Sequence, residues 1–144
     1  MIILHPSGFS RASRPAFRQA VAMAKTKRAQ LLILHVVELS AALPGGGSVP
    51  AVVYRDLQQW VQSVAQKRLN RVVGQARRLG ARANGLLEDG IPYQQIVKTA
   101  RSKHTDMIVM ATHGQTGLAR ILLGSVASRV VTLAPCPVLT VRSR

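Results

Sequence analysis

The chain has 144 residues, of which 47% are apolar, so its length and composition suit one domain, spanning residues 1–144, with a buried core. No apolar run approaches the roughly 18 residues that a membrane span needs, and a single cysteine excludes an internal disulfide. Twenty lysine and arginine residues against five acidic residues give a formal net charge of +15, which attracts anions such as nucleotides, nucleic acid or acidic lipid.

The first segment of the chain predicts a strand, a turn and a helix. Residues 2–5 form a short apolar run, and the proline, serine and glycine at 6–8 favour a turn after it. A helix is predicted over about residues 13–28. Its apolar positions recur at helical spacing on one face, namely Phe17, Ala20, Val21 and Ala24.

The next segment predicts a buried strand, a loop and a long helix. Residues 31–37 are apolar almost throughout, as in a strand covered on both faces, and 38–52 contain two prolines and three consecutive glycines. A helix follows over about 53–79, with one apolar side formed by Leu69, Val72, Val73, Ala76 and Leu79. A basic stripe lies opposite, formed by Lys67, Arg71, Arg78 and Arg82, and we favour an ordinary solvated face as its interpretation.

The last segment continues the same alternation. Residues 84–88 predict a weak strand, and Pro92 lies near the start of a third helix, where its missing N–H costs nothing. A fourth strand is predicted over 106–111, a fourth helix from Ser125, and a last strand over 138–141.

This order of elements predicts the fold class. Four strand–helix units followed by a final strand are typical of an α/β protein with a Rossmann-like, open five-stranded parallel sheet and helices on both faces. Such sheets bind ligands at the carboxyl ends of their strands, where the winding direction changes. The turns after the first and fourth strands are therefore the candidate binding segments.

The turn after the fourth strand has the composition of a phosphate-binding loop. It contains two glycines over 111–117, and Gly124 and Ser125 open the next helix. Glycine lets a backbone approach an anion closely, and the first N–H groups of a helix have no helical partners. The Ser125 hydroxyl can add a donor and can also cap the helix. On the residues alone, a plain glycine turn is an equal alternative.

Other chemistry has little support in the sequence. The P-loop pattern GxxxxGK[ST] is absent, and the turn after the first strand reads PSGFS rather than the dinucleotide pattern GxGxxG. His5 and His35 stand at strand positions and are interpreted as structural, and Cys136, between two prolines, as a small buried thiol. Only five acidic residues exist, with no pair at a useful spacing. We therefore expect a protein that is not an enzyme and has no structural metal.

Residues 106–142 resemble the C-terminal signature of the universal stress protein family. Its ATP-binding members carry Gly-x2-Gly-x9-Gly-[Ser/Thr], matched here by Ala111, Gly114, Gly124 and Ser125. The segments PSGFSRAS, HVVE and EDGIP also fit, so the resemblance covers essentially the whole chain. Gly8 departs from the family because an aspartate is usual there, and Ala111 departs because the first motif glycine is usual there.

The resemblance implies a site for ATP, with or without Mg²⁺, built from three groups of residues. The adenosine would be bordered by Pro6, Ser7 and Val36. The ribose and phosphates would lie along the backbone of Met110, Ala111, His113, Gly114 and Gln115. The phosphates would be held by Gly124, Ser125 and Val126.

The function expected on this basis is that of a nucleotide-binding module in the stress response or in signalling, which acts by binding and not by turnover; slow ATP hydrolysis stays open. One alternative is a family member that binds no nucleotide and acts through protein contacts, which Gly8 favours. A second is a basic stress protein associated with nucleic acid, although scarce aromatics (3%) and the lack of a nucleic-acid motif argue against it. The N-terminal MIILHP is no secretory signal, so we expect a cytoplasmic protein.

A homodimer is also expected. In the family's order the final strand lies at a sheet edge, and an edge strand exposes unpaired N–H and C=O groups. Pairing with the same strand of a second copy would cover both edges. The residues involved would be Val138, Leu139, Thr140 and Val141.

Overall fold

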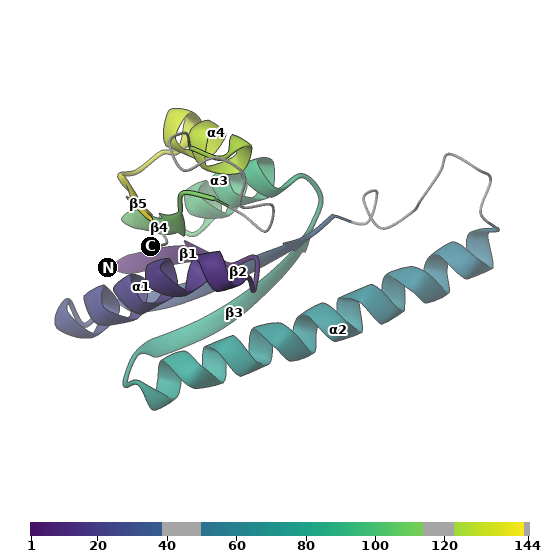
Figure 1. Cartoon of the computed structure of the whole chain (residues 1–144), viewed down its shortest axis with the longest axis horizontal. Coiled ribbons are helices and arrows are strands. Elements are labelled where there is room, and N and C mark those ends of the chain that lie inside the picture. The colour runs from purple at the N-terminus through teal and green to yellow at the C-terminus, as the bar shows by residue number, and fades with distance from the viewer. Residues whose placement is uncertain (39–49, 114–122, 143–144) are drawn as a thin grey trace.

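The computed structural model describes residues 1–38, 50–113 and 123–142. Its sheet has five parallel strands in the order β3-β2-β1-β4-β5, as Figure 1 shows. The strands are β1 (Ile2–Pro6), β2 (Gln30–Val37), β3 (Arg82–Asp89), β4 (Met107–Ala111) and β5 (Val138–Val141). The helices are α1 (Arg14–Thr26), α2 (Ala51–Arg78), α3 (Pro92–Ser102) and α4 (Ser125–Leu133), with a short 3₁₀ turn at Arg11–Ser13. The predicted α/β class and the alternation of strands and helices are confirmed.

Helices cover both faces of the sheet and bury a separate apolar cluster on each. On one face α1 and α2 pack over Ile3, Leu31 and Ile33, and all four predicted apolar positions of α1 are buried there. On the other face α3 and α4 pack over Leu4 and Ile108. Because side chains alternate between the faces of a strand, the continuous apolar runs of β1 and β2 supply both clusters.

Helix α2 has two unlike halves. Its C-terminal half packs against β3, where Gly85 allows a close approach: a Cβ at this residue would lie 3.0 Å from Cγ of Leu69. Its N-terminal half projects beyond the sheet (Figure 1), and the side chains of Val52 and Trp60 are 65% and 64% exposed. No helix in the described part of the chain is both long and apolar enough to cross a membrane.

Three helices end in a residue with a positive φ angle. These residues are Arg28 after α1 (φ 50°), Gly80 after α2 (φ 92°) and His104 after α3 (φ 49°). Such a left-handed residue reverses the chain at a helix end, and glycine adopts it without strain. The strands that follow, β2, β3 and β4, therefore all start at one end of the sheet, beside the C-termini of these helices.

Several sequence predictions need correction at element boundaries. Strand β3 is not weak: it spans eight residues and pairs with β2 along its whole length. Helix α2 ends at Arg78, so Arg82 belongs to β3 and not to the helical stripe. Gly80, with its positive φ, explains why the helix ends before Arg82. Leu79, predicted to face the core, is 46% exposed because it lies in that terminal turn.

Two side-chain predictions were also wrong in part. Ser125 does not cap α4: Gly124 is the N-cap residue, and no side-chain hydrogen bond caps this helix. Cys136 is only half-buried, at the border of the cluster beneath α3 and α4. Partial burial raises the pKa of its thiol, with a smaller contribution from the negative charge of Asp106.

Candidate functional site

The order of the strands places a switch point between β1 and β4. From β1 the chain proceeds to β2 on one side, and β4 is followed by β5 on the other side. Open parallel sheets form a ligand crevice at the carboxyl ends of two such strands. Here β1 ends at Pro6 and β4 ends at Ala111, so the two turns selected from the sequence lie at this switch point.

The turn after β1 is held by hydrogen bonds around Ser7. The Ser7 N–H donates to Leu34 O at 2.8 Å, and His35 Nδ1–H donates to Ser7 O at 2.7 Å. The Ser7 hydroxyl oxygen accepts from the Phe9 N–H at 3.3 Å. Ser7 itself is buried, with 7% of its surface exposed. The turn is therefore fixed by β2, the neighbouring strand.

Phe9 completes this turn in an unusual conformation. Its φ angle of 58° lies in the left-handed region, which is uncommon for a bulky residue. Its ring stacks on the His35 ring, with centroids 4.1 Å apart. A strained residue supported by such contacts is often found at a functional site, so Phe9 belongs with the candidate residues.

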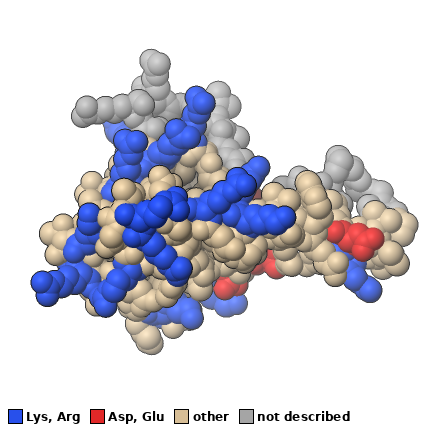
Figure 2. Space-filling view, turned by 90° about the horizontal axis from the view of Figure 1, so that it is seen from below, with Lys and Arg blue, Asp and Glu red and all other residues tan. Residues whose placement is uncertain are grey.

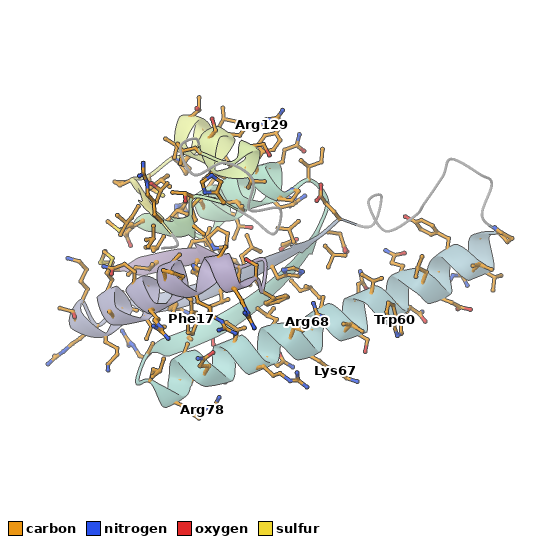
Figure 3. All side chains as sticks on the ribbon, viewed as in Figure 1. Phe17, Trp60, Lys67, Arg68, Arg78 and Arg129 are labelled. Atoms are coloured by element: carbon orange, nitrogen blue, oxygen red, sulfur yellow. The ribbon has the colours of Figure 1, made fainter. Side chains whose placement is uncertain are left out.

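The surroundings of His35 disfavour the charged form of its imidazole. Burial lowers the pKa of its imidazole, its hydrogen bond to Ser7 works against this, and the positive charge of Arg68 lowers the pKa further. Arg68 extends from α2 on the side of the sheet, whereas Lys67 and Arg78 extend from the other side (Figure 3). His35, Phe9 and Arg68 were not selected from the sequence, because their meeting depends on contacts between distant segments.

The residues that directly follow β4 are held beside those that precede α4. The Thr112 N–H donates to Val141 O at 3.1 Å, which ties it to β5. The Gly124 N–H then donates to Thr112 O at 2.8 Å, and Ser128 N–H donates to Gly124 O at 2.9 Å. These bonds hold the N-terminus of α4 beside the carboxyl end of β4.

The N-terminus of α4 is suited to an anion. Its first turn contains no acidic residue and no side chain caps it. The first N–H groups of a helix have no helical acceptor, and the helix dipole adds a partial positive charge there. Gly124 has φ −59° and ψ 159°, a conformation open to any residue, so close approach and not backbone strain is its possible role.

His113 offers a second observation at the same place. Its Nδ1 lies 3.0 Å from the Thr112 hydroxyl oxygen. Its Nε2 is buried and has no hydrogen-bond partner among the described residues. A buried ring nitrogen without a partner is costly, and a bound polar group can supply one. The residues at this end of the sheet therefore fit a phosphate-bearing ligand.

The predicted site residues can now be located. Pro6 ends β1 and Ser7 follows it, Met110 and Ala111 end β4, and Val36 lies on β2 among residues that pack toward α3 and α4. His113, Gly124, Ser125 and Val126 follow β4 or open α4. Gly114 and Gln115 lie outside the described residues. Among the residues that are described, no three histidine, cysteine or acidic side chains gather as metal ligands would.

This architecture is that of a Rossmann-like α/β protein with a loop and helix N-terminus at its switch point. The chain belongs to the universal stress protein family, whose model matches residues 1–142. Universal stress protein MJ0531 of Methanocaldococcus jannaschii is 37% identical over 142 residues, covering 97% of this chain and 81% of that protein. The solved structure of protein MJ0577, of the same organism, superposes with a TM-score of 0.84 at 27% identity and covers 99% of this chain and 96% of that one.

Some solved members of the family carry nucleotides. The universal stress protein from Archaeoglobus fulgidus was solved in complex with dAMP; it is 24% identical, with a TM-score of 0.67, and covers 98% of this chain and 96% of that one. Others were solved with cAMP or with AMP, at TM-scores of 0.70 and 0.67. At 24% identity or less, these likenesses show the fold.

Proposed function

We propose that this chain binds ATP in the crevice between β1 and β4 and acts by binding, as a stress-response or signalling module of the cytoplasm. The observation that carries the proposal is the N-terminus of α4, which lacks acidic residues and is fixed beside β4 by the bond from Gly124 N–H to Thr112 O. Nucleotides bound to solved relatives support it. The module would use all of residues 1–144 as one domain.

The roles proposed for the residues are those that the family resemblance implies. Pro6, Ser7 and Val36 would border the adenosine. The backbone from Met110 to Gln115 would line the ribose and phosphates. Ser125 and Val126 would hold the phosphates with their N–H groups and the exposed Ser125 hydroxyl, and Gly124, whose own N–H donates to Thr112 O, would let the phosphates approach closely.

Calorimetric titration with ATP, adenosine and GTP tests the proposal. Charge-assisted hydrogen bonds are the strong ones, so ATP should bind at least roughly tenfold more tightly than adenosine, and GTP should be discriminated only weakly. The variant Gly124→Val should bind ATP at least about tenfold more weakly, because its side chain obstructs close approach of a phosphate. Gly124→Ala is the matched control with a smaller obstruction. Adenosine binding more tightly than ATP, or unchanged ATP binding by a folded Gly124→Val variant, would contradict the proposed site.

Gly8 supports the alternative, a member of the family that binds no nucleotide and works through protein contacts. The aspartate usual at this position is missing, and with it a polar contact to the nucleoside. Absence of any ATP heat in the same titration, with the protein folded, would favour this alternative. Slow hydrolysis of bound ATP would be seen as ADP appearing over hours in the same samples.

The proposed module is a homodimer joined through β5. Within the described residues this strand pairs only with β4, and its four residues are half-buried. Pro137 O and Val141 O accept hydrogen bonds from β4 and the residue after it, so by alternation Leu139 faces β4 too, while Val138 and Thr140 turn their backbone groups outward. Antiparallel pairing of two β5 strands about a twofold axis would use these outward groups.

The variant Thr140→Pro tests this interface, because it removes an outward N–H while leaving the groups of Leu139 in place. Sedimentation equilibrium should give a dimer for the wild type and a monomer for Thr140→Pro. Thr140→Val keeps the backbone N–H and should stay dimeric. A wild-type mass of one chain at tens of micromolar protein, or a folded and dimeric Thr140→Pro, would overturn the proposal.

A further inference from the structure

The amino end of the sheet carries a basic hollow that the proposed function does not use. It has a volume of about 300 Å³ and lies between the C-terminus of α1 and the start of β3. Its lining residues are Ala24, Lys25, Arg28, Ala29, Gly80 and Arg82. The eight residues of β2 separate this end from the carboxyl end, which is a distance of roughly 25 Å.

Three cationic residues from two segments line this hollow, namely Lys25, Arg28 and Arg82. Lys25 lies against Gly80: a Cβ at this glycine would be 3.3 Å from Cε and 3.7 Å from Nζ of Lys25. The Arg82 Nη2 donates a hydrogen bond to Arg28 O, which anchors the guanidinium at the end of α1. Because Gly80 has no side chain, the Lys25 ammonium can lie beside the chain reversal that leads into β3.

These cations are not needed to cap the helices that end here. At the end of α1, the carbonyls of Met23, Ala24 and Lys25 accept from the N–H groups of Lys27, Ala29 and Arg28. At the end of α2, those of Gln75, Ala76 and Arg77 accept from Leu79, Ala81 and Gly80. These six carbonyls are thus satisfied by the backbone, so they do not occupy the side chains of Lys25 and Arg28.

Arg28 adds a sign of strain at this place. Its φ of 50° is left-handed, which costs a non-glycine residue about 1 kcal/mol, whereas Gly80 has the equivalent position after α2. Glycine would adopt this conformation without strain, so the presence of an arginine indicates that its side chain has a function.

The lining of the hollow carries no negative charge. No carboxylate is among its lining residues. The exposed cations Lys27, Arg77 and Arg78 lie in the same terminal turns. In Figure 2 basic side chains spread over the body of the molecule, while the largest acidic group in that view lies toward its projecting end.

We propose that this hollow is a second anion site, which binds the terminal phosphate of a small phosphate-bearing molecule. At neutral pH such a phosphate carries nearly two negative charges, which the three cations compensate. Two arginines can each offer paired N–H donors to phosphate oxygens, and Lys25 acts as a point charge. A concave site of about 300 Å³ suits a small anion better than the backbone of a nucleic acid.

Residue-resolved NMR tests the site, because it separates the two ends of the sheet in one experiment. The amide signals of uniformly ¹⁵N-labelled full-length protein are followed while sodium tripolyphosphate, and separately inorganic phosphate, is added at low salt. The amides of Arg28, Ala29, Gly80 and Ala81 should shift and saturate. Any binding at the proposed ATP site would move Thr112 and Val126 instead.

Two double variants with the same loss of charge sharpen the test. Lys25→Gln with Arg28→Asn removes two cations of the hollow, and asparagine tolerates the left-handed backbone at position 28. Arg101→Gln with Lys103→Gln removes two cations at the same end of the sheet but outside the hollow. The first should weaken tripolyphosphate binding at the hollow amides at least roughly tenfold, and the second less than about twofold.

Three results would overturn the proposal. Equal losses of tripolyphosphate affinity in both double variants would mean that the positive potential of the whole amino end, and not the hollow, attracts the anion. Shifts confined to the amides around Thr112 and Gly124 would mean that phosphate binds at the carboxyl end alone. If a short DNA duplex shifts the same amides and binds more tightly than tripolyphosphate at about 150 mM salt, the ligand of the hollow would be nucleic acid and not a small anion.

Discussion

The two ends of the sheet both suit anions, but by different means. At the carboxyl end the attraction comes from backbone N–H groups and from helix N-termini whose first turns contain no acidic residue. At the amino end it comes from side chains, because the last turns of α1, α2 and α3 are basic. Glu38, Glu88 and Asp89 lie at the carboxyl ends of β2 and β3, and Asp106 precedes β4.

This difference distinguishes basic residues that complement helix dipoles from basic residues that could bind a ligand, which the net charge alone does not do. In a parallel α/β sheet, the C-termini of all helices gather at the amino end, so basic residues there complement the helix dipoles. Arg77, Arg78 and Arg101, which lie in such last turns, are thereby explained without any partner. Arg82, which lines the hollow together with Lys25 and Arg28, is not covered by this explanation, because it lies in β3 and not in the last turn of a helix.

The largest expected effect is a loss of stability at low pH, caused by His5 near the carboxyl end of β1. His5 in β1 is fully buried, donates from Nδ1 to Val109 O at 2.8 Å, and has no described partner for Nε2. Burial lowers its pKa from 6.5 to about 4, against the opposing effect of the Val109 bond. Between these values the unfolded chain binds a proton that the folded protein does not, so stability falls as the pH falls from 6.5 to 4. The whole loss is on the order of 3 kcal/mol.

Urea unfolding at pH 7 and pH 5 measures this effect. The wild type should lose about 2 kcal/mol between these two pH values. In the variant His5→Gln, which keeps a donor for Val109 O but does not titrate, the loss should be much smaller. His35, whose pKa is also lowered, would account for what remains. Equal stability of the wild type at both pH values would contradict the role of His5.

A smaller effect is expected at the amino end, where a glycine is needed. The variant Gly80→Ala should destabilise the protein by about 1 to 2 kcal/mol, because φ is 92° at this position and the new methyl group would displace Lys25. Gly74, inside α2, is the matched control: its added Cβ would meet only the Arg78 guanidinium at 3.4 Å. Gly74→Ala should stabilise by roughly 0.5 to 1 kcal/mol. Thermal unfolding of both variants decides the matter, and equal effects would contradict the distinction.

Gly80 also shows where prediction from the sequence succeeds and where it fails. Alternation and apolar periodicity were enough for the fold, because β1, β2 and the buried face of α1 follow directly from them. The helical stripe was extended to Arg82 because periodicity was followed past Gly80, although a glycine after basic residues is itself a helix-end signal.

The contacts that build both sites could not be predicted from local pattern. His35 and Ser7 lie 28 residues apart, and Arg82 and Arg28 lie 54 residues apart. Only the right-handed crossover that places β2 between β1 and β3 brings these pairs together. The glycines and Ser125 after β4 were visible because phosphate-binding loops have a local composition. The charged residues around the hollow have no such local composition, because they come from distant segments.

The smallest expected effect is a gain at the carboxyl end, from restoring the acid usual at position 8. The backbone of Gly8 does not have the left-handed φ that favours glycine, and an added Cβ would meet nothing within 4 Å. Gly8→Asp should therefore fold as the wild type does. A carboxylate there can accept hydrogen bonds from a nucleoside, and we expect adenosine to bind about threefold to tenfold more tightly.

Comparing ligands and a control variant shows whether the adenosine lies at this turn. The gain for ATP should be smaller than that for adenosine, because the new negative charge repels the phosphates. Gly8→Ala adds the Cβ without the charge and should bind both ligands as the wild type does. Calorimetry on the three proteins gives the answer. If Gly8→Asp is folded and leaves adenosine binding unchanged, then the nucleoside is not held beside Ser7. The phosphates alone would then fix the ligand through Gly124 and the first turn of α4.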